Sequence, residues 1–281
     1  MKKENFIDYT NKTFKGIAKD LVLNQIELFY EKPKFLNKTI YKEGEEVFLK
    51  KNTFIHGIFG NLENFDFTIS NGFISTDFTS NARENKICNS VGMWKIKEDI
   101  RLKDYINLYS GFTITYSIGR GPNAITKSKL IPYHKFDEMT ETINNDDNIW
   151  TYWGTKTKEV SFLPSLVSEK RQIAFIINTE SDYAKKLIEA DIWNLDLTEE
   201  ELKYFIDYRY LPKFLNERKN KDASTTDREA AIIFGIPNIL IEGVFVGRKI
   251  ENDKTALKYI KNQLPECYIC NLDGRVITGN N

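Results

Sequence analysis

The sequence changes from charged to apolar within one short segment, Asp227-Arg228-Glu229-Ala230-Ala231-Ile232-Ile233-Phe234-Gly235-Ile236-Pro237. An isoleucine-rich run of this length, closed by glycine and proline, is typical of a buried β-strand. Side chains on a strand alternate between its faces, so Asp227 and Glu229 share one face. Glu229 therefore stands at the mouth of a buried strand, where a carboxylate is held rigidly and still reaches a cleft. The alternative is a salt bridge at a strand end, which is common and contributes little to stability.

Apolar periodicity predicts helices and strands on the N-terminal and C-terminal sides of this segment. The turn signal Ser70-Asn71-Gly72 divides two of the predicted strands. Strands are expected at 47–49, 53–59, 65–69, 72–78, 111–117, 172–178, 229–234, 240–247 and 267–271, and helices at 13–30, 182–190, 198–210 and 253–264.

Residues 119–159 have the least regular pattern, and we expect a long surface excursion there with one short helix. Strands at both ends of the chain bracket the helices, which favours an α+β fold with a mainly antiparallel sheet. We expect an N-terminal helical segment at 1–45, followed by a single α+β domain at 46–281.

Composition limits the class of protein. The chain has 281 residues, 41% of them hydrophobic, and its 40 basic and 40 acidic side chains cancel. A net charge of zero argues against a surface built throughout to hold nucleic acid, although it leaves room for a local basic patch. No apolar run approaches the roughly 20 residues that span a bilayer, and no apolar stretch follows the charged N-terminus. With 3 cysteines in all, we expect a cytoplasmic protein without membrane association.

Two short motifs are expected to be structural. Gly119-Arg120-Gly121 lacks the strand and helix of a phosphate-binding loop and is expected to be a turn. Cys267 and Cys270 form a lone Cys-x-x-Cys pair, and the chain has only 2 histidines to complete a metal site. We therefore expect no bound metal, and we expect both cysteines to be small apolar core residues.

His56 interrupts an apolar strand and is followed directly by Gly57. A histidine in this setting is often a core residue with one hydrogen-bond partner. Glycine inside a strand, however, often marks the close approach of a ligand or of another backbone. The structural and the functional interpretation of His56 both stay open on this pattern.

Three blocks, taken in order, resemble the ADP-ribosyltransferase superfamily, and most of all its DNA-modifying toxins of the DarT type. The first block joins Phe54-Ile-His56-Gly-Ile-Phe-Gly-Asn-Leu62 to Ser70-Asn-Gly-Phe-Ile-Ser-Thr76. The second is Leu102-Lys-Asp-Tyr-Ile-Asn-Leu-Tyr109, and the third runs from Arg228-Glu229 through Ile236-Pro237 to Val246. The resemblance covers roughly residues 50–250.

The resemblance implies split antiparallel β-sheets with flanking helices, and a mono-ADP-ribosyltransferase, toxin-like or effector-like, that uses NAD+ as co-substrate. Its transition state is oxocarbenium-like and needs a carboxylate beside the ribose, as in glycosidases. Glu229 is implied as the catalytic glutamate, which orients the ribose and stabilises positive charge. Of the cofactor-binding residues, His56 would bond the adenosine ribose, a tyrosine would stack on nicotinamide, and an arginine would pair with the pyrophosphate. The implied set is His56, Gly57, Arg83, Arg101, Tyr109 and Tyr116.

Several alternatives stay open. The acceptor is nucleic acid or protein: basic residues such as Lys219 and Lys221 before Glu229 favour the former, and Asp227 resembles a paired position of protein-modifying transferases. An antidote protein is a possible partner. A second hypothesis is a catalytically silent module on the same fold that binds NAD+, a nucleotide or a protein. A third is a nuclease or glycosidase with a second acid from Asp227, Glu242 or Asp77.

Overall fold

The computed structural model describes residues 2–31, 33, 36, 41–58, 62–80, 87–109, 111–118, 125–132, 149–151, 172–219 and 229–277. For 80, 107–109, 111–118, 125–132 and 149–151 it describes the backbone alone. The helices are α1 (Lys3–Thr13), α2 (Gly16–Tyr30), α3 (Leu62–Asn71), α4 (Thr76–Ser80), α5 (Leu102–Tyr109), α7 (Asp182–Ile188), α8 (Glu199–Leu202), α9 (Leu211–Lys219), η5 (Asn238–Leu240), α10 (Arg248–Asn252) and α11 (Lys254–Gln263). The strands are β1 (Tyr41–Glu43), β2 (Glu46–Leu49), β3 (Phe54–Ile58), β4 (Phe73–Ile74), β5 (Ser90–Lys95), β6 (Ile100–Arg101), β7 (Gly111–Ile118), β8 (Ile125–Pro132), β9 (Ile149–Thr151), β10 (Ile173–Ile177), β11 (Glu229–Ile233), β12 (Gly235–Ile236), β13 (Ile241–Val246) and β14 (Tyr268–Cys270).

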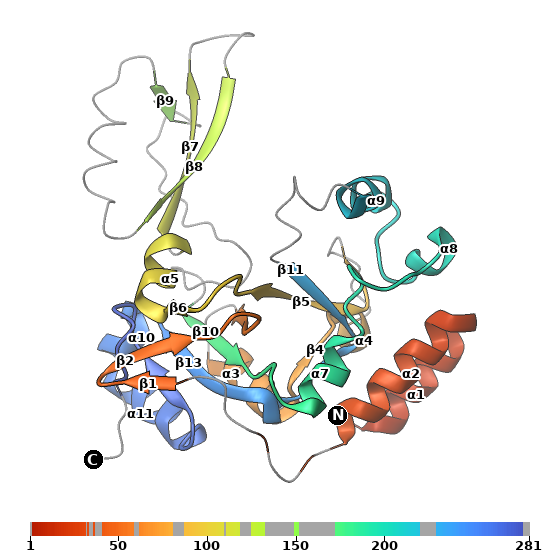
Figure 1. Cartoon of the computed structure of the whole chain (residues 1–281), viewed down its shortest axis with the longest axis horizontal. Helices are drawn as coiled ribbons and strands as arrows, with labels where there is room; N and C mark the ends of the chain where they lie inside the picture. Colours follow the sequence, from red (N-terminus) through yellow and green to blue (C-terminus); the bar gives the residue numbers. More distant parts are fainter. Residues whose placement is uncertain are drawn as a thin grey trace.

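A six-stranded sheet in the order β11-β5-β3-β10-β13-β14 forms the centre of the molecule (Figure 1). Its pairs are antiparallel except β13–β14, which is parallel. The strands come from all parts of the chain, so the sheet depends on pairing between distant segments. The expected α+β class with a mainly antiparallel sheet is confirmed.

The sheet divides between β3 and β5. These strands pair at Phe54↔Lys95 and Ile55↔Trp94. Beyond this point β3 stays paired with β10 as far as Ile58, while β5 stays paired with β11 as far as Ser90. The two parts of the sheet therefore separate after the second pair.

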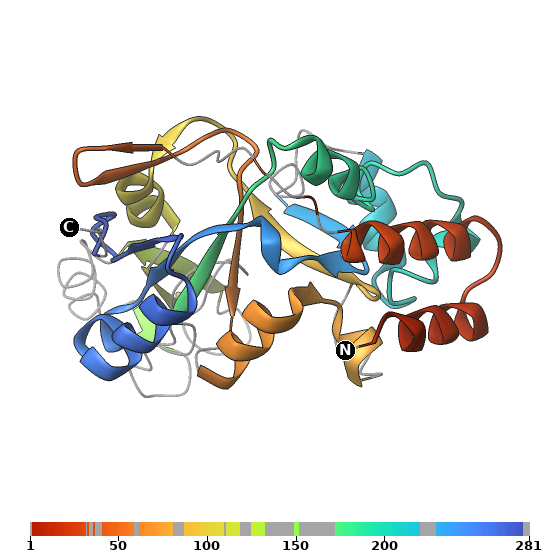
Figure 2. The ribbon, with the colours of Figure 1, turned by 90° about the horizontal axis from the view of Figure 1, so that it is seen from below.

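Apolar side chains cover both faces of the sheet. On one face, alternate residues of β3, β10, β11 and β13 pack with α3, α7 and α11. On the other face, β3, β10 and β13 pack against β2 and α5, while β11 packs against the helical hairpin α1–α2 and the segment from α8 to α9. Figure 2 shows α1 and α2 side by side at the β11 end and α10 and α11 at the other. Alternation along each strand thus divides the core in two.

The predicted strand at 65–69 is wrong, because these residues belong to helix α3. Phe65 is fully buried whereas Phe67 is 41% exposed, so the apolar positions follow the helical period and not the period of two. The turn signal marks the end of this helix: Gly72 has φ of +81° and donates its N–H to the carbonyl of Thr68. The expected strand at 72–78 shrinks to β4, and α4 follows it.

The helix predicted at 13–30 is confirmed as α2, and helix α1, which was not predicted as a separate element, precedes it. Two other expectations need correction. The helix predicted at 198–210 has its capping box at Thr198 but ends at Leu202. Ile206 then pairs with Ile87, so tertiary pairing ends the helix. The irregular region 119–159 contains β8 and β9, which flank β7 in a three-stranded sheet.

Other predicted elements are confirmed. The buried strand at 172–178 is β10, all of whose residues are buried. The helix at 253–264 is α11, and Asp253 caps it by accepting from the N–H groups of Thr255 and Ala256. The last short strand is β14. Among the described residues, no helix has the length and apolar character needed to cross a bilayer.

Gly235 tests the close packing of β12 on β4. A Cβ at Gly235 would lie 2.0 Å from the carbonyl oxygen of Phe73, whereas a Cβ at Gly16 would meet no atom within 4 Å. We expect Gly235→Ala to lower the free energy of unfolding by roughly 3 kcal/mol or more, as overpacking does. Gly16→Ala should cost about 1–2 kcal/mol, because φ at Gly16 is +56°. Equal losses in urea unfolding would contradict this assignment.

The reactivity of Cys267 and Cys270 tests how deeply each is buried at the β14 end of the sheet. Burial raises the pKa of the Cys270 thiol to about 12, against a smaller opposing effect of Lys42. Cys267 is half-buried, and its thiol lies 3.5 Å from the carbonyl oxygen of Ile241. Because the thiolate is the reactive form, iodoacetamide at pH 8 should label Cys267 in the folded protein and Cys270 only after unfolding. Peptide mass spectrometry with Cys267→Ser as control measures this, and equally fast labelling of both would refute it.

Candidate functional site

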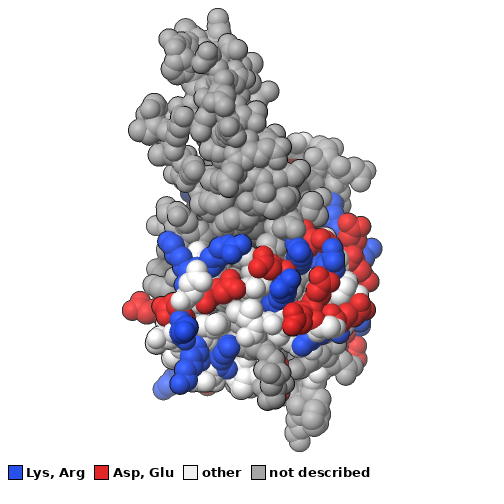
Figure 3. All heavy atoms as spheres, turned by 90° about the vertical axis from the view of Figure 1, so that its left-hand side faces the viewer, with Lys and Arg blue, Asp and Glu red and all other residues white. Residues whose placement is uncertain are grey.

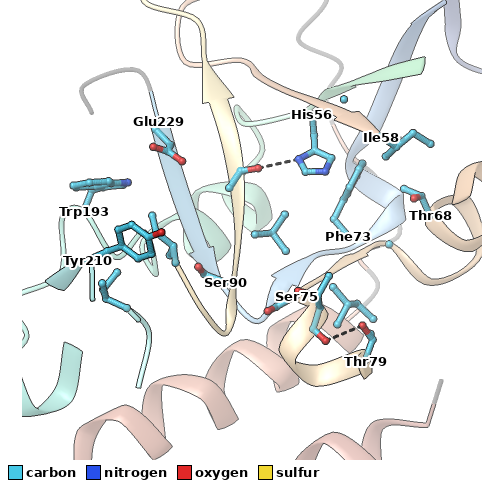
Figure 4. A pocket seen from close by; sticks show the side chains of 18 of the residues that line it. His56, Ile58, Thr68, Phe73, Ser75, Thr79, Ser90, Trp193, Tyr210 and Glu229 are labelled. Atoms are coloured by element: carbon cyan, nitrogen blue, oxygen red, sulfur yellow. Dashed lines mark hydrogen bonds between the residues drawn. The ribbon is translucent and has the colours of Figure 1, made fainter. Parts of the chain in front are cut away.

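A pocket of about 710 Å³ opens where β3 and β5 separate, and both His56 and Glu229 line it (Figure 4). In this view Trp193 and Tyr210 lie on one side of Glu229, and His56, Phe73 and Thr68 lie on the other. The described lining residues come from five parts of the chain. They are His56, Gly57 and Ile58 of β3; Asn64, Phe67, Thr68, Gly72, Phe73, Ile74, Ser75, Thr76 and Thr79 from α3 to α4; Ile87, three residues before β5, with Ser90, Val91 and Gly92 of β5; Trp193, Ile206, Tyr210, Lys213, Phe214 and Glu217 in the segment that ends with α9; and Glu229 of β11.

The strand registers explain why one pocket holds both groups. His56 pairs with Phe175 and contacts the ring of Phe73, and both phenylalanines belong to the core on the α3 side. Glu229 pairs with Trp94, which belongs to the core on the opposite face. In a continuous sheet these side chains would be kept apart. The separation of β3 from β5 lets a single pocket reach both.

His56 has a defined hydrogen bond to the neighbouring strand. Its Nδ1 lies 2.8 Å from the carbonyl oxygen of Gly92. A carbonyl oxygen only accepts, so Nδ1 carries a proton and donates this hydrogen bond. The ring also packs edge-on against Phe73 at a centroid distance of 5.0 Å. These contacts hold a half-buried imidazole in one orientation.

Glu229 is the first residue of β11 and is half-buried. Its Oε1 lies 3.5 Å from the position that a Cβ at Gly92 would occupy. The carboxylate therefore lies over the Cα of Gly92, which has no side chain. The carbonyl of the same glycine accepts the hydrogen bond from His56. Asp227, which was expected to share a face with Glu229, lies outside the described residues.

The outer edge of β11 is covered by the segment that carries Trp193. The N–H of Ile192 donates to the carbonyl of Ala231, and the N–H of Ile233 donates to the carbonyl of Ala190. Between these bonds, Oδ1 of Asp191 accepts from the N–H groups of Ala231, at 2.9 Å, and Trp193, at 3.3 Å. Asp191 is 2% exposed. The buried carboxylate of Asp191 thus connects β11, the strand of Glu229, to the segment that carries Trp193.

The wall at Trp193 was not predicted from the sequence. The indole stacks on Phe214 of α9 at 4.2 Å, and Lys213 forms an ion pair with Glu217 at 3.5 Å. Lys213 is the single lysine or arginine among the described residues that line the pocket. No helix was predicted at 211–219, where α9 lies, and no signal linked these residues to Trp193 before the tertiary packing was known.

The remaining predicted residues divide into two groups. Gly57 lines the pocket, but Arg101 is not among its described lining residues. Arg101 instead donates to Asp104 at 2.8 Å and to Glu46 at 3.4 Å, and these contacts raise its pKa, the Asp104 hydrogen bond most of all. Arg83 lies outside the described residues, as do the side chains of Tyr109 in α5 and Tyr116 in β7.

Two of the acids considered for a second catalytic role, Glu242 and Asp77, do not gather with Glu229. Glu242 is buried on β13, where it accepts from Asn178 at 2.5 Å. Asp77 is buried in α4, and neither acid lines the pocket in the part of the chain that is described. Glu217 is the acid that shares the pocket with Glu229. No group of three or more histidine, cysteine or acidic side chains suited to a metal ion occurs among the described residues.

Asp191 can be tested through stability. Asp191→Ala leaves the buried N–H groups of Ala231 and Trp193 without their acceptor, and we expect a loss of roughly 2–4 kcal/mol in the free energy of unfolding. Asp191→Asn keeps a carbonyl oxygen for both and should lose less. The control is Asp20→Ala, on the exposed side of α2, which should stay within about 0.5 kcal/mol of the parent protein. Urea unfolding measures all three, and equal stabilities of the Asp191→Ala and Asp20→Ala variants would disprove the role.

Comparisons with known proteins do not assign the chain to a family. No family model matches it, and neither a curated protein nor a solved structure is found to match. A functional conclusion must therefore come from the residues of the pocket and their geometry.

Proposed function

We propose that the protein is an NAD+-dependent mono-ADP-ribosyltransferase, toxin-like or effector-like, with Glu229 as its catalytic glutamate. The observation that carries the proposal is the meeting of His56 and Glu229, which are far apart in the sequence, in one pocket. The volume of about 710 Å³ lies within the roughly 300–1,000 Å³ usual for small-molecule sites. The division of the sheet between β3 and β5 is in keeping with the split sheets that the sequence resemblance implies.

The proposed reaction breaks the bond between nicotinamide and the C1′ of its ribose. The electron pair of that bond leaves with nicotinamide, and positive charge develops on C1′ and the ring oxygen. A nucleophile of the acceptor then bonds C1′ and gives up its proton. Glu229 stabilises the developing charge, and fixed electrostatic groups of this kind are worth roughly 3–4 kcal/mol each.

The other residues of the proposal bind the dinucleotide. His56 hydrogen-bonds a hydroxyl of the adenosine ribose, and Gly57 beside it lets the ligand approach the backbone of β3. Arg83 is our preferred partner of the pyrophosphate, because Thr79 and Ile87 on either side of it in the sequence line the pocket. Arg101 is the less favoured choice, because Asp104 and Glu46 already pair with it. Either Tyr109 or Tyr116 stacks on nicotinamide.

Both classes of acceptor remain part of the proposal. On the face shown in Figure 3, basic and acidic side chains are interspersed over the described residues, with no extended surface of one sign. This distribution does not select nucleic acid over protein. We place the reaction in the cytoplasm, and an antidote protein would be the natural means for a producing cell to control it.

Replacement of Glu229 tests the proposal. Glu229→Gln keeps the shape of the side chain and removes its charge, so nicotinamide release and label transfer from adenylate-labelled NAD+ should fall roughly 100- to 1,000-fold. Glu199→Gln, on exposed α8, is the matched control and should keep full activity. Thermal melting of both variants should match the parent protein.

The outcomes separate the hypotheses. Full activity of the Glu229→Gln variant would refute the catalytic assignment. Calorimetric binding of NAD+ by the parent protein, without nicotinamide release, would instead support a catalytically silent binding module. Labelled protein bands or labelled nucleic acid would identify the acceptor class.

A further inference from the structure

Gly92, in the middle of β5, lies against both functional groups of the pocket. Its carbonyl oxygen is the partner of His56 Nδ1 at 2.8 Å. A Cβ at the same residue would meet Oε1 of Glu229 at 3.5 Å. No strand was predicted at 90–95, so this glycine was not recognised as lying inside a strand.

The backbone conformation of Gly92 does not require glycine. Its φ lies outside the left-handed region, in contrast to Gly72 and Gly274. Glycine in the interior of a strand weakens the strand, and its presence there often marks the close approach of another group. The atom that a Cβ at Gly92 would meet is the carboxylate oxygen of Glu229. The missing side chain thus leaves space beside the proposed catalytic group.

The hydrogen bond to His56 crosses the division of the sheet. Ile55 and Trp94 form the last ladder pair between β3 and β5. The imidazole of His56, one residue further along β3, then reaches the carbonyl of Gly92, two residues before Trp94. This bond joins the two strands where the ladder has ended, at the pocket.

We propose that Gly92 is a positioning residue for both groups. Its carbonyl accepts from the Nδ1–H of His56 and so fixes the tautomer and the orientation of the ring at the pocket. Its bare Cα keeps one side of the Glu229 carboxylate open to the reacting ribose. The second role rests on the proposed function, whereas the first rests on the His56 geometry alone.

Enlarging the side chain at Gly92 tests the second role. We expect the kcat/KM of nicotinamide release to fall roughly 10-fold for Gly92→Ala and roughly 100-fold for Gly92→Val. The added atoms occupy the space beside the Glu229 carboxylate and displace the ribose from its reacting position, and small displacements of this kind cost such factors. Melting temperature should stay level or rise, because alanine and valine both favour a strand over glycine. A purely structural glycine would lose stability and activity together. Met93→Leu, whose side chain lies on the opposite face of β5, is the control and should keep activity.

The pH profile of activity and a double variant test whether the loss of activity in the Gly92 variants acts through Glu229. A methyl group displaces water from the carboxylate and so favours its protonated form. The acid limb of the activity profile should therefore move to higher pH in the Gly92→Ala variant. In the Glu229→Gln background, Gly92→Val should cause little further loss, because residues that act through one another are not additive.

The tautomer of His56 tests the first role without any activity measurement. The chain has 2 histidines, so a His134→Gln variant labelled with ¹⁵N leaves His56 as the single histidine signal. We expect the neutral ring to carry its proton on Nδ1. A proton on Nε2 would overturn this role.

The two proposals fail in different ways. A parent protein without nicotinamide release, but with His56 as the Nδ1–H tautomer, would refute the proposed function and the role of Gly92 toward Glu229, and would leave the His56 geometry standing. An active parent protein whose Gly92→Val variant keeps full activity would refute the inference about Gly92 and leave the proposed function standing.

Discussion

The separation of β3 from β5 after Ile55 is the constraint on which the pocket depends. A continuous antiparallel ladder would place His56 and Glu229 on opposite faces and fill the space between them with apolar side chains. Because the ladder has two pairs and then divides, the pocket passes between the strands and reaches both residues. The hydrogen bond from His56 to Gly92 joins the strands where the pocket begins. A polar side chain thus connects the two parts of the sheet beyond the ladder, and it also faces the pocket.

The covering of β11 is the second requirement. β11 lies at the edge of the six-stranded sheet, and an uncovered edge offers its backbone groups to other chains. The segment from Ala190 to Trp193 pairs with this edge, and Asp191 supplies an acceptor where the backbone does not. The same segment carries Trp193 to the pocket, where it stacks on Phe214. Protection of the edge and construction of the second pocket wall are therefore one structural feature.

Local patterns predicted the elements whose environment is uniform along their length. β10 is buried throughout and appears in the sequence as a continuous apolar run, and β13, also buried throughout, is apolar apart from Glu242 and Gly243. α11 begins after Asp253, the first residue of the predicted helix. The errors occur where two periods fit the same residues or where tertiary pairing ends an element. Phe65, Phe67 and Ile69 alternate as a strand would, yet the chain is helical there, because Phe65 packs against Phe175 while Phe67 stays at the pocket rim. The helix after Thr198 ends early because Ile206 pairs with a residue more than one hundred positions earlier, Ile87.

In the candidate site, too, some residues could be identified from local sequence patterns and others could not. Glu229 at the mouth of a buried strand and His56 beside a glycine were visible in the sequence, because a polar residue in an apolar run stands out locally. Gly92, Asp191 and Trp193 were not visible, because each acts through a contact with a distant segment and has no distinctive local pattern. The sequence therefore established the α+β class and two candidate residues, since both follow from the order of polar and apolar side chains along the chain. Their meeting in one pocket required the folded chain, because the register of β3, β5 and β11, and the point where two of them part, are set by long-range pairing.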